Sequence, residues 1–251
     1  MRNLPQEFVR VLREKGMFYL PRFMVRFPRR YDGRDEPAMK LQAVLFDFDM
    51  TLIDTSEALL HNVNMIARAF SRPECSREQL LQVIGYNTRD FWTALLGDNR
   101  PEYGAYYLEH CIPIEARRMF PAAGAVDCVE VLRSAGMKVG CASNRIGPMR
   151  VIRLMKLEGL MDCVTGADDV ERAKPAPDVL LKAASLLEAA PERTLYIGDT
   201  PIDAQAAIAA GMKCVCVTTS NARQTLEAAG AWRVIPDLTG LVPLLRAEGM
   251  I

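Results

Sequence analysis

Four aspartates stand at positions where they could hold a metal ion. Asp47 and Asp49 lie two residues apart directly after an apolar run, so both can project to the same side at the end of a strand. Asp199 follows a second apolar run, and Asp203 lies one helical turn further on. Carboxylates gathered in this way would repel one another unless a cation balanced their charge. Oxygen ligands with no His or Cys beside them favour Mg²⁺ over zinc.

Anion-binding groups accompany these carboxylates. Ser143 and Asn144 follow a third apolar run, and Lys174 stands with Pro175 just before a predicted helix. A hydroxyl, an ammonium group and a bound metal around one carboxylate are typical of a site for phosphoryl transfer. The residue types therefore predict chemistry on a phosphate group.

These side chains need a scaffold that brings several strand ends together. Downstream of residue 119, apolar runs alternate with helical patterns, and glycines follow several helix ends. This alternation predicts a parallel sheet covered on both faces, with ligands bound beyond the carboxyl ends of its strands. The predicted strands are 43–46, 138–142, 163–165, 194–197, 213–217 and 233–235. The helices predicted before the second to fifth of these strands are, in order, 124–135, 148–157, 177–189 and 201–210; one further helix precedes the last strand and another follows it.

A helical region interrupts the alternation after the first strand. We expect helices capped by Ser56 and by Ser76, the second with a capping box that uses Gln79, and further helices over 88–97 and 101–118. The fold class is therefore α/β, a Rossmann-like core with an inserted α-helical cap. The predicted domains are a basic N-terminal extension (1–40), a core (41–55 and 119–251) and a cap (56–118).

The motifs resemble those of the haloacid dehalogenase (HAD) superfamily. The matching segments, in chain order, are Asp47-Phe48-Asp49-Met50-Thr51, Ser143, Lys174-Pro175 and Gly198-Asp199-Thr200-Pro201-Ile202-Asp203. The helical insertion is similar to the C1 cap of the phosphoglycolate phosphatase-like and β-phosphoglucomutase-like branch. The resemblance runs from about Leu41 to the C-terminus and does not cover residues 1–40.

The resemblance implies a role for each residue of the first motif. Asp47 would be the nucleophile that forms an aspartyl-phosphate. Asp49 would protonate the leaving oxygen and then activate water. Thr51 would orient the acid/base loop.

The later motifs would hold the phosphoryl group and the metal. Ser143, with Asn144 beside it, would bind phosphoryl oxygens, and Lys174 would neutralise Asp47 and the substrate. Asp199 would bind Mg²⁺ together with Asp47 and the backbone carbonyl of Asp49. Asp203 would be a more distant ligand or a partner of the ligands.

Two features concern substrate entry and the cap. Most HAD relatives have Gly where this chain has Met50, and a glycine there eases the turn after the strand. We expect altered loop geometry or substrate entry rather than lost chemistry. In the cap, Asn87, Thr88 and Arg89 could form a substrate-specificity loop with Arg89 on the substrate, or Asn87 could simply cap a helix.

Composition limits the other classes. The 251 residues carry 31 Lys and Arg against 31 Asp and Glu, so a nucleic-acid footprint is not expected. Residues 1–40 hold ten of the basic residues and five of the acidic ones, which makes this extension basic. Residues 5–20 could form a short amphipathic helix, with Phe8, Val9, Leu12 and Phe18 near one face. The extension could dock a partner or membrane, form a tail, or precede a true start at Met39. No apolar run is long enough to span a membrane. Seven scattered cysteines and the absence of a signal sequence favour the cytoplasm, with the chain a monomer or a homodimer.

The leading functional hypothesis is a Mg²⁺-dependent phosphatase. It would hydrolyse a small phosphorylated metabolite, a phosphomonoester such as phosphoglycolate or a sugar phosphate, through an aspartyl-phosphate. Two alternatives remain open: a β-phosphoglucomutase-type isomerase, which returns the phosphoryl group to the sugar, and a catalytically silent phosphometabolite-binding protein. A dehalogenase is disfavoured because it has no use for Asp49.

Overall fold

The computed structural model describes two separate units of the chain. The described residues are 17–20, 23–26 and 40–251, and the units are Met1–Pro37 and Ala38–Ile251.

A short hairpin is described in the first unit. Strand β1 (Met17–Leu20) pairs antiparallel with β2 (Phe23–Arg26). A helix over 5–20, which the spacing of apolar residues favours, is therefore wrong at its C-terminal end, and residues 5–16 lie outside the described residues. Aromatic and β-branched residues such as Tyr19 and Val25 favour extended backbone, which explains the outcome.

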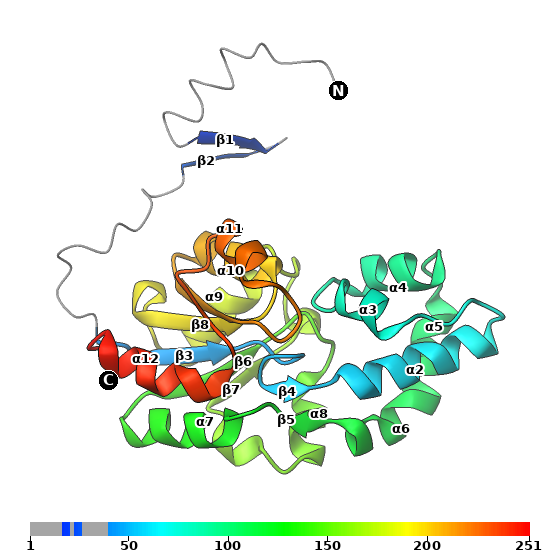
Figure 1. Ribbon diagram of the computed structural model, residues 1–251, viewed down its shortest axis with the longest axis horizontal. Helices are drawn as coiled ribbons and strands as arrows, with labels where there is room; N and C mark the ends of the chain where they lie inside the picture. Colours follow the sequence, from blue (N-terminus) through cyan, green and yellow to red (C-terminus); the bar gives the residue numbers. More distant parts are fainter. Residues whose placement is uncertain (1–16, 21–22, 27–39) are drawn as a thin grey trace. The chain divides into compact units, whose positions relative to one another are not determined.

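The second unit is organised around a parallel six-stranded sheet in the order β10-β9-β8-β3-β6-β7 (Figure 1). The first strand of the core, β3, pairs with β8 on one side and β6 on the other. The bounds are β3 (Ala43–Phe46), β6 (Lys138–Ala142), β7 (Cys163–Thr165), β8 (Thr194–Gly198), β9 (Lys213–Val217) and β10 (Arg233–Ile235).

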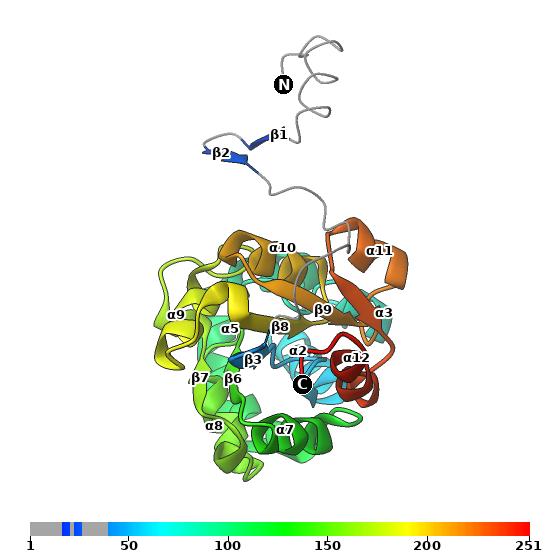
Figure 2. The same ribbon diagram turned by 90° about the vertical axis from the view of Figure 1, so that its left-hand side faces the viewer.

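Both faces of the sheet are buried under helices. On β3, Val44 and Phe46 belong to one apolar cluster and Ala43 and Leu45 to the other, which is the alternation of a strand covered on both sides. Figure 2 shows helices on both sides of the sheet. One face carries α7 (Ala125–Ser134), α8 (Pro148–Leu154) and α12 (Leu241–Ala247); the other carries α9 (Asp178–Leu186), α10 (Pro201–Ala210) and α11 (Arg223–Ala228).

The cap consists of helices inserted between two short strands that connect it to the core. Strands β4 (Ile53–Asp54) and β5 (Phe120–Pro121) pair antiparallel, so the chain leaves and re-enters the core at one place. The expected helix over 101–118 is divided into four short helical pieces. The cap elements are α2 (Ser56–Ala69), α3 (Arg77–Leu81), α4 (Thr88–Leu96), α5 (Pro101–Tyr106), the π-helical turn η1 (Tyr107–Cys111), α6 (Ile112–Glu115) and the 3₁₀ turn η2 (Ala116–Arg118).

The helix caps agree with the sequence in two of three cases. Ser76 and Gln79 form the predicted capping box of α3, and Asn87 caps α4 by accepting from the backbone N–H of Asp90. Ser56, in contrast, is the first residue of α2 rather than its cap, because its N–H and hydroxyl both donate to Asp54. Over the described part of the chain, no helix is both long and apolar enough to cross a membrane.

Candidate active site

The first-motif aspartate lies at the carboxyl end of the central strand. The backbone N–H of Asp47 donates to the carbonyl of Ile197 on β8, at 2.8 Å, which fixes where β3 ends. Its side chain is buried and accepts from the Lys174 ammonium group at 2.8 Å. Two residues far apart in the sequence are therefore joined at the sheet edge, as the motifs predict.

Lys174 has three polar partners and no exposed side-chain surface. Its ammonium nitrogen lies 2.8 Å from Asp47 Oδ1, 2.7 Å from Asp203 Oδ1 and 2.8 Å from the Tyr196 hydroxyl. Burial works against its positive charge, but Asp203 and Asp47 outweigh burial and raise the pKa of Lys174. Tyr196 donates in turn to the carbonyl of Ala142 at 2.9 Å, so the strand β6 helps to place the ammonium group.

Asn144 fixes the backbone around the lysine and reaches the cap. Its Oδ1 accepts from the Lys174 N–H at 2.7 Å, and its Nδ2 donates to the Lys174 carbonyl at 3.0 Å. The same Nδ2 lies 3.0 Å from the carbonyl of Gly85 in the cap. The buried Ser143 hydroxyl accepts from the Arg145 N–H at 3.2 Å. Asn144 therefore orders Lys174 through backbone contacts.

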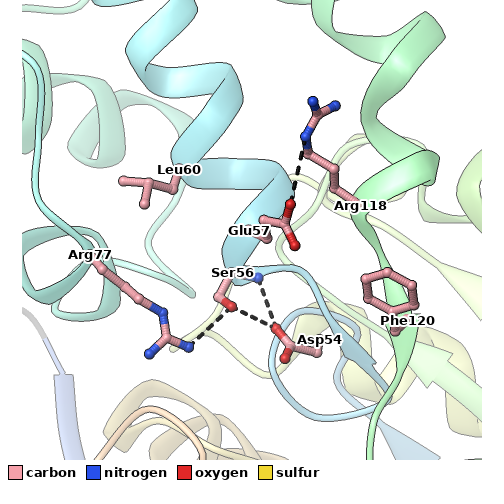
Figure 3. Close-up of a pocket in the computed structure, with 7 residues that line it drawn as sticks. All are labelled: Asp54, Ser56, Glu57, Leu60, Arg77, Arg118 and Phe120. Atoms are coloured by element: carbon pink, nitrogen blue, oxygen red, sulfur yellow. Dashed lines mark hydrogen bonds and ion pairs between the residues drawn. The ribbon is translucent and has the colours of Figure 1, made fainter.

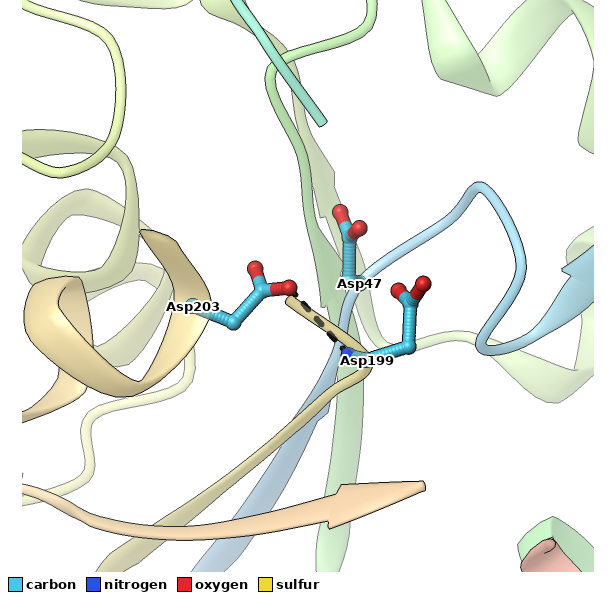
Figure 4. A group of neighbouring side chains, drawn as sticks. All are labelled: Asp47, Asp199 and Asp203. Carbon is cyan, nitrogen blue, oxygen red and sulfur yellow. Dashed lines mark hydrogen bonds between the residues drawn. The ribbon is translucent and has the colours of Figure 1, made fainter. Parts of the chain in front are cut away.

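Asp199 and Asp203 complete an acidic cluster with Asp47 (Figure 4). All three are buried, and each offers a carboxylate oxygen within 4.8 Å of the others. Asp203 Oδ2 accepts from the backbone N–H groups of Asp199 and Thr200 and from the Thr200 hydroxyl, at 3.2, 3.0 and 2.6 Å. This capping box at the start of α10 is the local reason why Asp203 points toward the strand ends.

The pKa shifts of the three aspartates indicate that Lys174 alone does not balance their negative charge. Burial raises the pKa of Asp47 to about 6 even though Lys174 pulls it down. Burial, together with Asp203 and Asp47, raises the pKa of Asp199 well above its usual range. Only for Asp203 do Lys174 and the Thr200 hydrogen bonds outweigh burial and lower the pKa. An oxygen-only donor set with unbalanced buried charge fits a hard divalent cation.

Asp199 is also held by hydroxyl groups. Thr51 donates to its Oδ1 at 2.9 Å, and Ser220 donates to its Oδ2. Asn221 donates to the Asp199 carbonyl at 3.1 Å. Thr51 therefore connects the first motif to the last one.

Asp49 lies beside the cluster and faces a different partner. Its carboxylate accepts from Arg145 Nη1 at 3.2 Å. Arg145 is buried, contacts Phe48 with its guanidinium 5.1 Å from the ring centroid, and also bonds to Tyr107 and Glu115 of the cap. Burial works against the charge of Arg145, but Asp49, Tyr107 and Glu115 raise its pKa.

Met50 adopts the backbone conformation that its residue type disfavours. Its φ of 60° lies in the left-handed region, where a glycine has no steric cost. Its N–H donates to the carbonyl of Ile53 at 2.8 Å, and its carbonyl accepts from the Thr219 hydroxyl at 2.5 Å. The side chain is buried within an apolar cluster made otherwise of cap residues.

Some residues around the site carry no signal in the sequence that would mark them. Tyr196 occupies an ordinary core position of a strand, and Ser220 lies in a loop after β9. Arg145 could have been suspected because it directly follows Ser143 and Asn144. Arg89, in contrast, is exposed on the first turn of α4, and its use in substrate binding stays a prediction.

A cavity of about 360 Å³ lies apart from these residues, where strands β4 and β5 connect the core to the cap (Figure 3). Arg77 donates to the Ser56 hydroxyl at 3.3 Å, and Arg118 lies 3.7 Å from Glu57 on its far side. None of the motif residues lines it. The lining residues are Asp54, Ser56, Glu57, Leu60, Arg77, Arg118 and Phe120.

Comparisons with known proteins agree with this geometry. Residues 44–217 match the family model described as haloacid dehalogenase-like hydrolase. A protein named pyrophosphatase PpaX from Bacillus mycoides is 30% identical over 210 residues, which cover 82% of this chain and 98% of that protein. The PpaX protein of Bacillus cereus strain Q1 is also 30% identical, with 82% and 97% covered.

Solved structures show the same fold. A hydrolase from Pseudomonas syringae aligns with a TM-score of 0.72 at 24% identity, covering 82% of this chain and 98% of that one. β-Phosphoglucomutase from Clostridium difficile aligns with a TM-score of 0.69 at 18% identity, covering 83% and 96%. At these identities the alignments support the core and cap architecture alone.

Proposed function

Because the chain belongs to the haloacid dehalogenase-like hydrolases and is a phosphatase of that family, we propose that it hydrolyses a small phosphorylated metabolite with Mg²⁺ through an aspartyl-phosphate. The observation that carries the proposal is the position of Asp47. Its carboxylate accepts from the Lys174 ammonium group and lies within 4.8 Å of the two other buried aspartates, at the edge of a parallel sheet where ligands bind.

Asp47, Asp199 and Asp203 are the side chains that would hold the metal, with the backbone carbonyl of Asp49 as a further ligand. When bound there, Mg²⁺ supplies positive charge that offsets the charge developing on the phosphoryl oxygens. Asp203 already accepts from Lys174 and Thr200, so we expect it to contribute less directly than Asp47 and Asp199.

The chain's own groups account for both steps of hydrolysis. In the first, an Asp47 oxygen bonds to phosphorus, the bond from phosphorus to the leaving oxygen breaks, and the Asp49 carboxyl gives that oxygen a proton. In the second, water attacks the same phosphorus, Asp49 takes a proton from the water, and the Asp47–phosphorus bond breaks. Lys174 stabilises negative charge throughout, and Ser143 binds a phosphoryl oxygen.

The substrate class rests on the relatives and the cap. The relatives named pyrophosphatase make inorganic pyrophosphate a substrate to test beside phosphoglycolate and sugar phosphates. Arg89 would contact the second anionic group of such a substrate from the cap. This assignment predicts that Arg89→Gln raises KM for phosphoglycolate more than for phenyl phosphate.

The test is phosphate release from a panel of these substrates with Mg²⁺. Asp47→Asn should reduce turnover by about 10³-fold or more, since the nucleophile is lost, and EDTA should abolish turnover of the wild type. Asp127→Asn, which changes an exposed aspartate on α7, is the matched control and should keep full activity. Undiminished turnover by Asp47→Asn would refute the mechanism. Rapid acid quenching should also trap phosphate on the peptide that contains Asp47.

A further inference from the structure

A buried charge cluster joins the acid/base residue to the cap. The Arg145 guanidinium donates from Nη1 to Asp49 at 3.2 Å, and from Nη2 to Glu115 at 2.9 Å and to the Tyr107 hydroxyl at 3.3 Å. Tyr107 donates in turn to Glu115. The side chains of Arg145 and Glu115 are 7% and 0% exposed, so this is not a pair of solvated surface charges.

The cluster takes its members from both parts of the second unit. Asp49 follows β3 and Arg145 follows β6, so both belong to the core. Tyr107 begins η1 and Glu115 ends α6, so both belong to the cap. One side chain therefore contacts the catalytic carboxylate of the core and two polar groups of the cap at the same time.

A buried charge cluster of this kind is not expected to add much to the stability of the fold. The cost of desolvating the charges offsets much of the attraction within a buried ion pair. Replacing such a pair with apolar residues of similar volume often leaves the protein equally stable or more stable. Glu115 Oε1 has no hydrogen-bond partner, although Arg150 Nη2 lies 3.6 Å away. The chain therefore keeps a buried, incompletely bonded carboxylate on the same arginine that binds Asp49, and stability alone does not explain it.

We propose that Arg145 is a positioning residue for Asp49, and that Glu115 and Tyr107 of the cap hold its guanidinium in the position that aligns Asp49. The inference rests on the proposed function, in which Asp49 delivers a proton to the leaving oxygen. It follows that contact of the cap with the core prepares the acid/base residue. The forked guanidinium suits this role because its two terminal nitrogens can hold two carboxylates in fixed directions.

The competing role for Arg145 is direct binding of a substrate anion. The observed contacts favour positioning, because both terminal nitrogens already donate to carboxylate or hydroxyl groups of the protein. A substrate anion would have to displace Glu115 or Asp49 from the guanidinium. The two roles predict that substitution of Arg145 reduces activity on different substrates.

The test uses the ratio of kcat/KM for p-nitrophenyl phosphate to that for phenyl phosphate. The two esters are similar in size, but phenol is the poorer leaving group and depends more on proton delivery. The parameter kcat/KM reports the first, phosphoryl-transfer step, and the ratio cancels the fraction of protein that is folded. We expect Arg145→Gln to raise the ratio by about 10- to 100-fold, because misplacing a general acid should cost part of the rate enhancement that the acid provides.

The cap variants make the inference specific. Glu115→Gln should raise the ratio by about tenfold, and Tyr107→Phe, which removes only a hydroxyl, by a few fold. Arg145→Lys should raise the ratio less than Arg145→Gln does, because lysine keeps the positive charge. The rescue should be incomplete, because one ammonium group cannot hold Asp49 and Glu115 in the same fork. Glu57→Gln, which removes an exposed carboxylate 3.7 Å from Arg118 on the cap, is the matched control and should leave the ratio unchanged.

Several outcomes would overturn the inference. An equal loss of kcat/KM for both esters would mean that the cluster is structural. A rise in KM confined to phosphoglycolate, with the ester ratio unchanged, would make Arg145 a substrate ligand. If Arg145→Gln does not fold, Tyr107→Phe, Glu115→Gln and the charge-neutral double variant Arg145→Gln/Glu115→Gln decide the question by the same ratio. If the wild type releases no phosphate, the proposed function is wrong as well. If the wild type turns over and the variants leave the ester ratio unchanged, only this inference is wrong.

Discussion

The acidic site of the core and the Arg145 cluster at the cap are both buried and charged, but they are assembled differently. In the acidic site, Asp47, Asp199 and Lys174 come from the core, and the aspartates lie directly at strand ends. The Arg145 cluster needs Tyr107 and Glu115 from the cap to complete its contacts. The first arrangement is fixed by the sheet, and the second exists only while cap and core touch.

This difference separates two tasks. The side chains of the acidic site all belong to the core, so we expect the core to bind the phosphoryl group and the metal with its own residues. Asp49, the proposed acid/base residue, accepts instead from Arg145, which also donates to Glu115 of the cap. Changes in the core site should therefore alter chemistry and metal binding together, whereas changes in the Arg145 cluster should alter proton delivery and leave metal binding intact.

The largest effect is expected from Lys174→Met. Turnover should fall by about 10³-fold or more, because the ammonium group no longer stabilises the phosphoryl charge. The metal-free protein should also lose about 3–5 kcal/mol of unfolding free energy, since Asp47 and Asp203 are left buried without their partner. Phosphate release and urea unfolding measure the two effects.

Two further variants sharpen this result. Lys174→Met/Asp203→Asn should regain much of the stability and none of the activity. Lys182→Met, which changes a partly exposed lysine of α9, should behave as the wild type. Turnover by Lys174→Met within tenfold of the wild type would contradict the role of the ammonium group.

Metal binding should depend on pH through the core site alone. Without metal, the pKa of Asp47 is raised to about 6 and that of Asp199 is raised well above its usual range, chiefly by burial. The folded state then holds protons that the unfolded state has lost, so the unfolding free energy of the metal-free protein falls as pH rises from about 4 through about 6. Mg²⁺ requires ionised carboxylates, so its stabilisation should grow over the same range, reaching about 3 kcal/mol at a hundredfold excess over Kd.

Thermal unfolding with Mg²⁺ or EDTA at about pH 5 and about pH 7.5 measures this linkage. Asp199→Asn should abolish the Mg²⁺ effect, and Glu115→Gln should retain it. Equal Mg²⁺ stabilisation at both pH values would show that the carboxylates are not protonated in the metal-free site. Loss of the effect in Glu115→Gln would show that the two clusters are not independent.

The same difference explains what could be predicted from the sequence. The parallel sheet and the meeting of Asp47 with Asp199 follow from two local facts: apolar runs end in Asp, and parallel strands end at one edge. The predicted capping box of α3 is equally local. Each of these predictions uses neighbouring residues and one rule of sheet geometry.

The cap contacts could not be found in this way. Glu115 and Tyr107 stand in short helices where a buried acid and a solvated acid have the same sequence pattern. Their burial depends on how the cap packs on the core, which no spacing rule specifies. The hairpin strand Met17–Leu20 was missed because its aromatic residues also fit one face of a helix.

The smallest and most discriminating effect concerns Met50, which belongs to both regions. Its backbone is part of the first-motif loop, with φ at 60°, and its side chain, 5% exposed, packs in the cap cluster. Replacement by Ala loses the packing and keeps the left-handed strain, whereas replacement by Gly loses the packing and relieves the strain. Met50→Gly should therefore be more stable than Met50→Ala by about 1 kcal/mol, with both below the wild type by about 2 kcal/mol or more.

Met119 provides the matched control, because it is 3% exposed but has an ordinary φ of −113°. There the usual order should return, with Met119→Ala more stable than Met119→Gly by about 0.5–1 kcal/mol. Urea unfolding of the four variants measures both differences. If Ala is the more stable replacement at both positions, the Met50 loop is unstrained. If Met50→Gly matches the wild type, the packing of the Met50 side chain in the cap cluster stabilises the protein by no more than the backbone strain destabilises it.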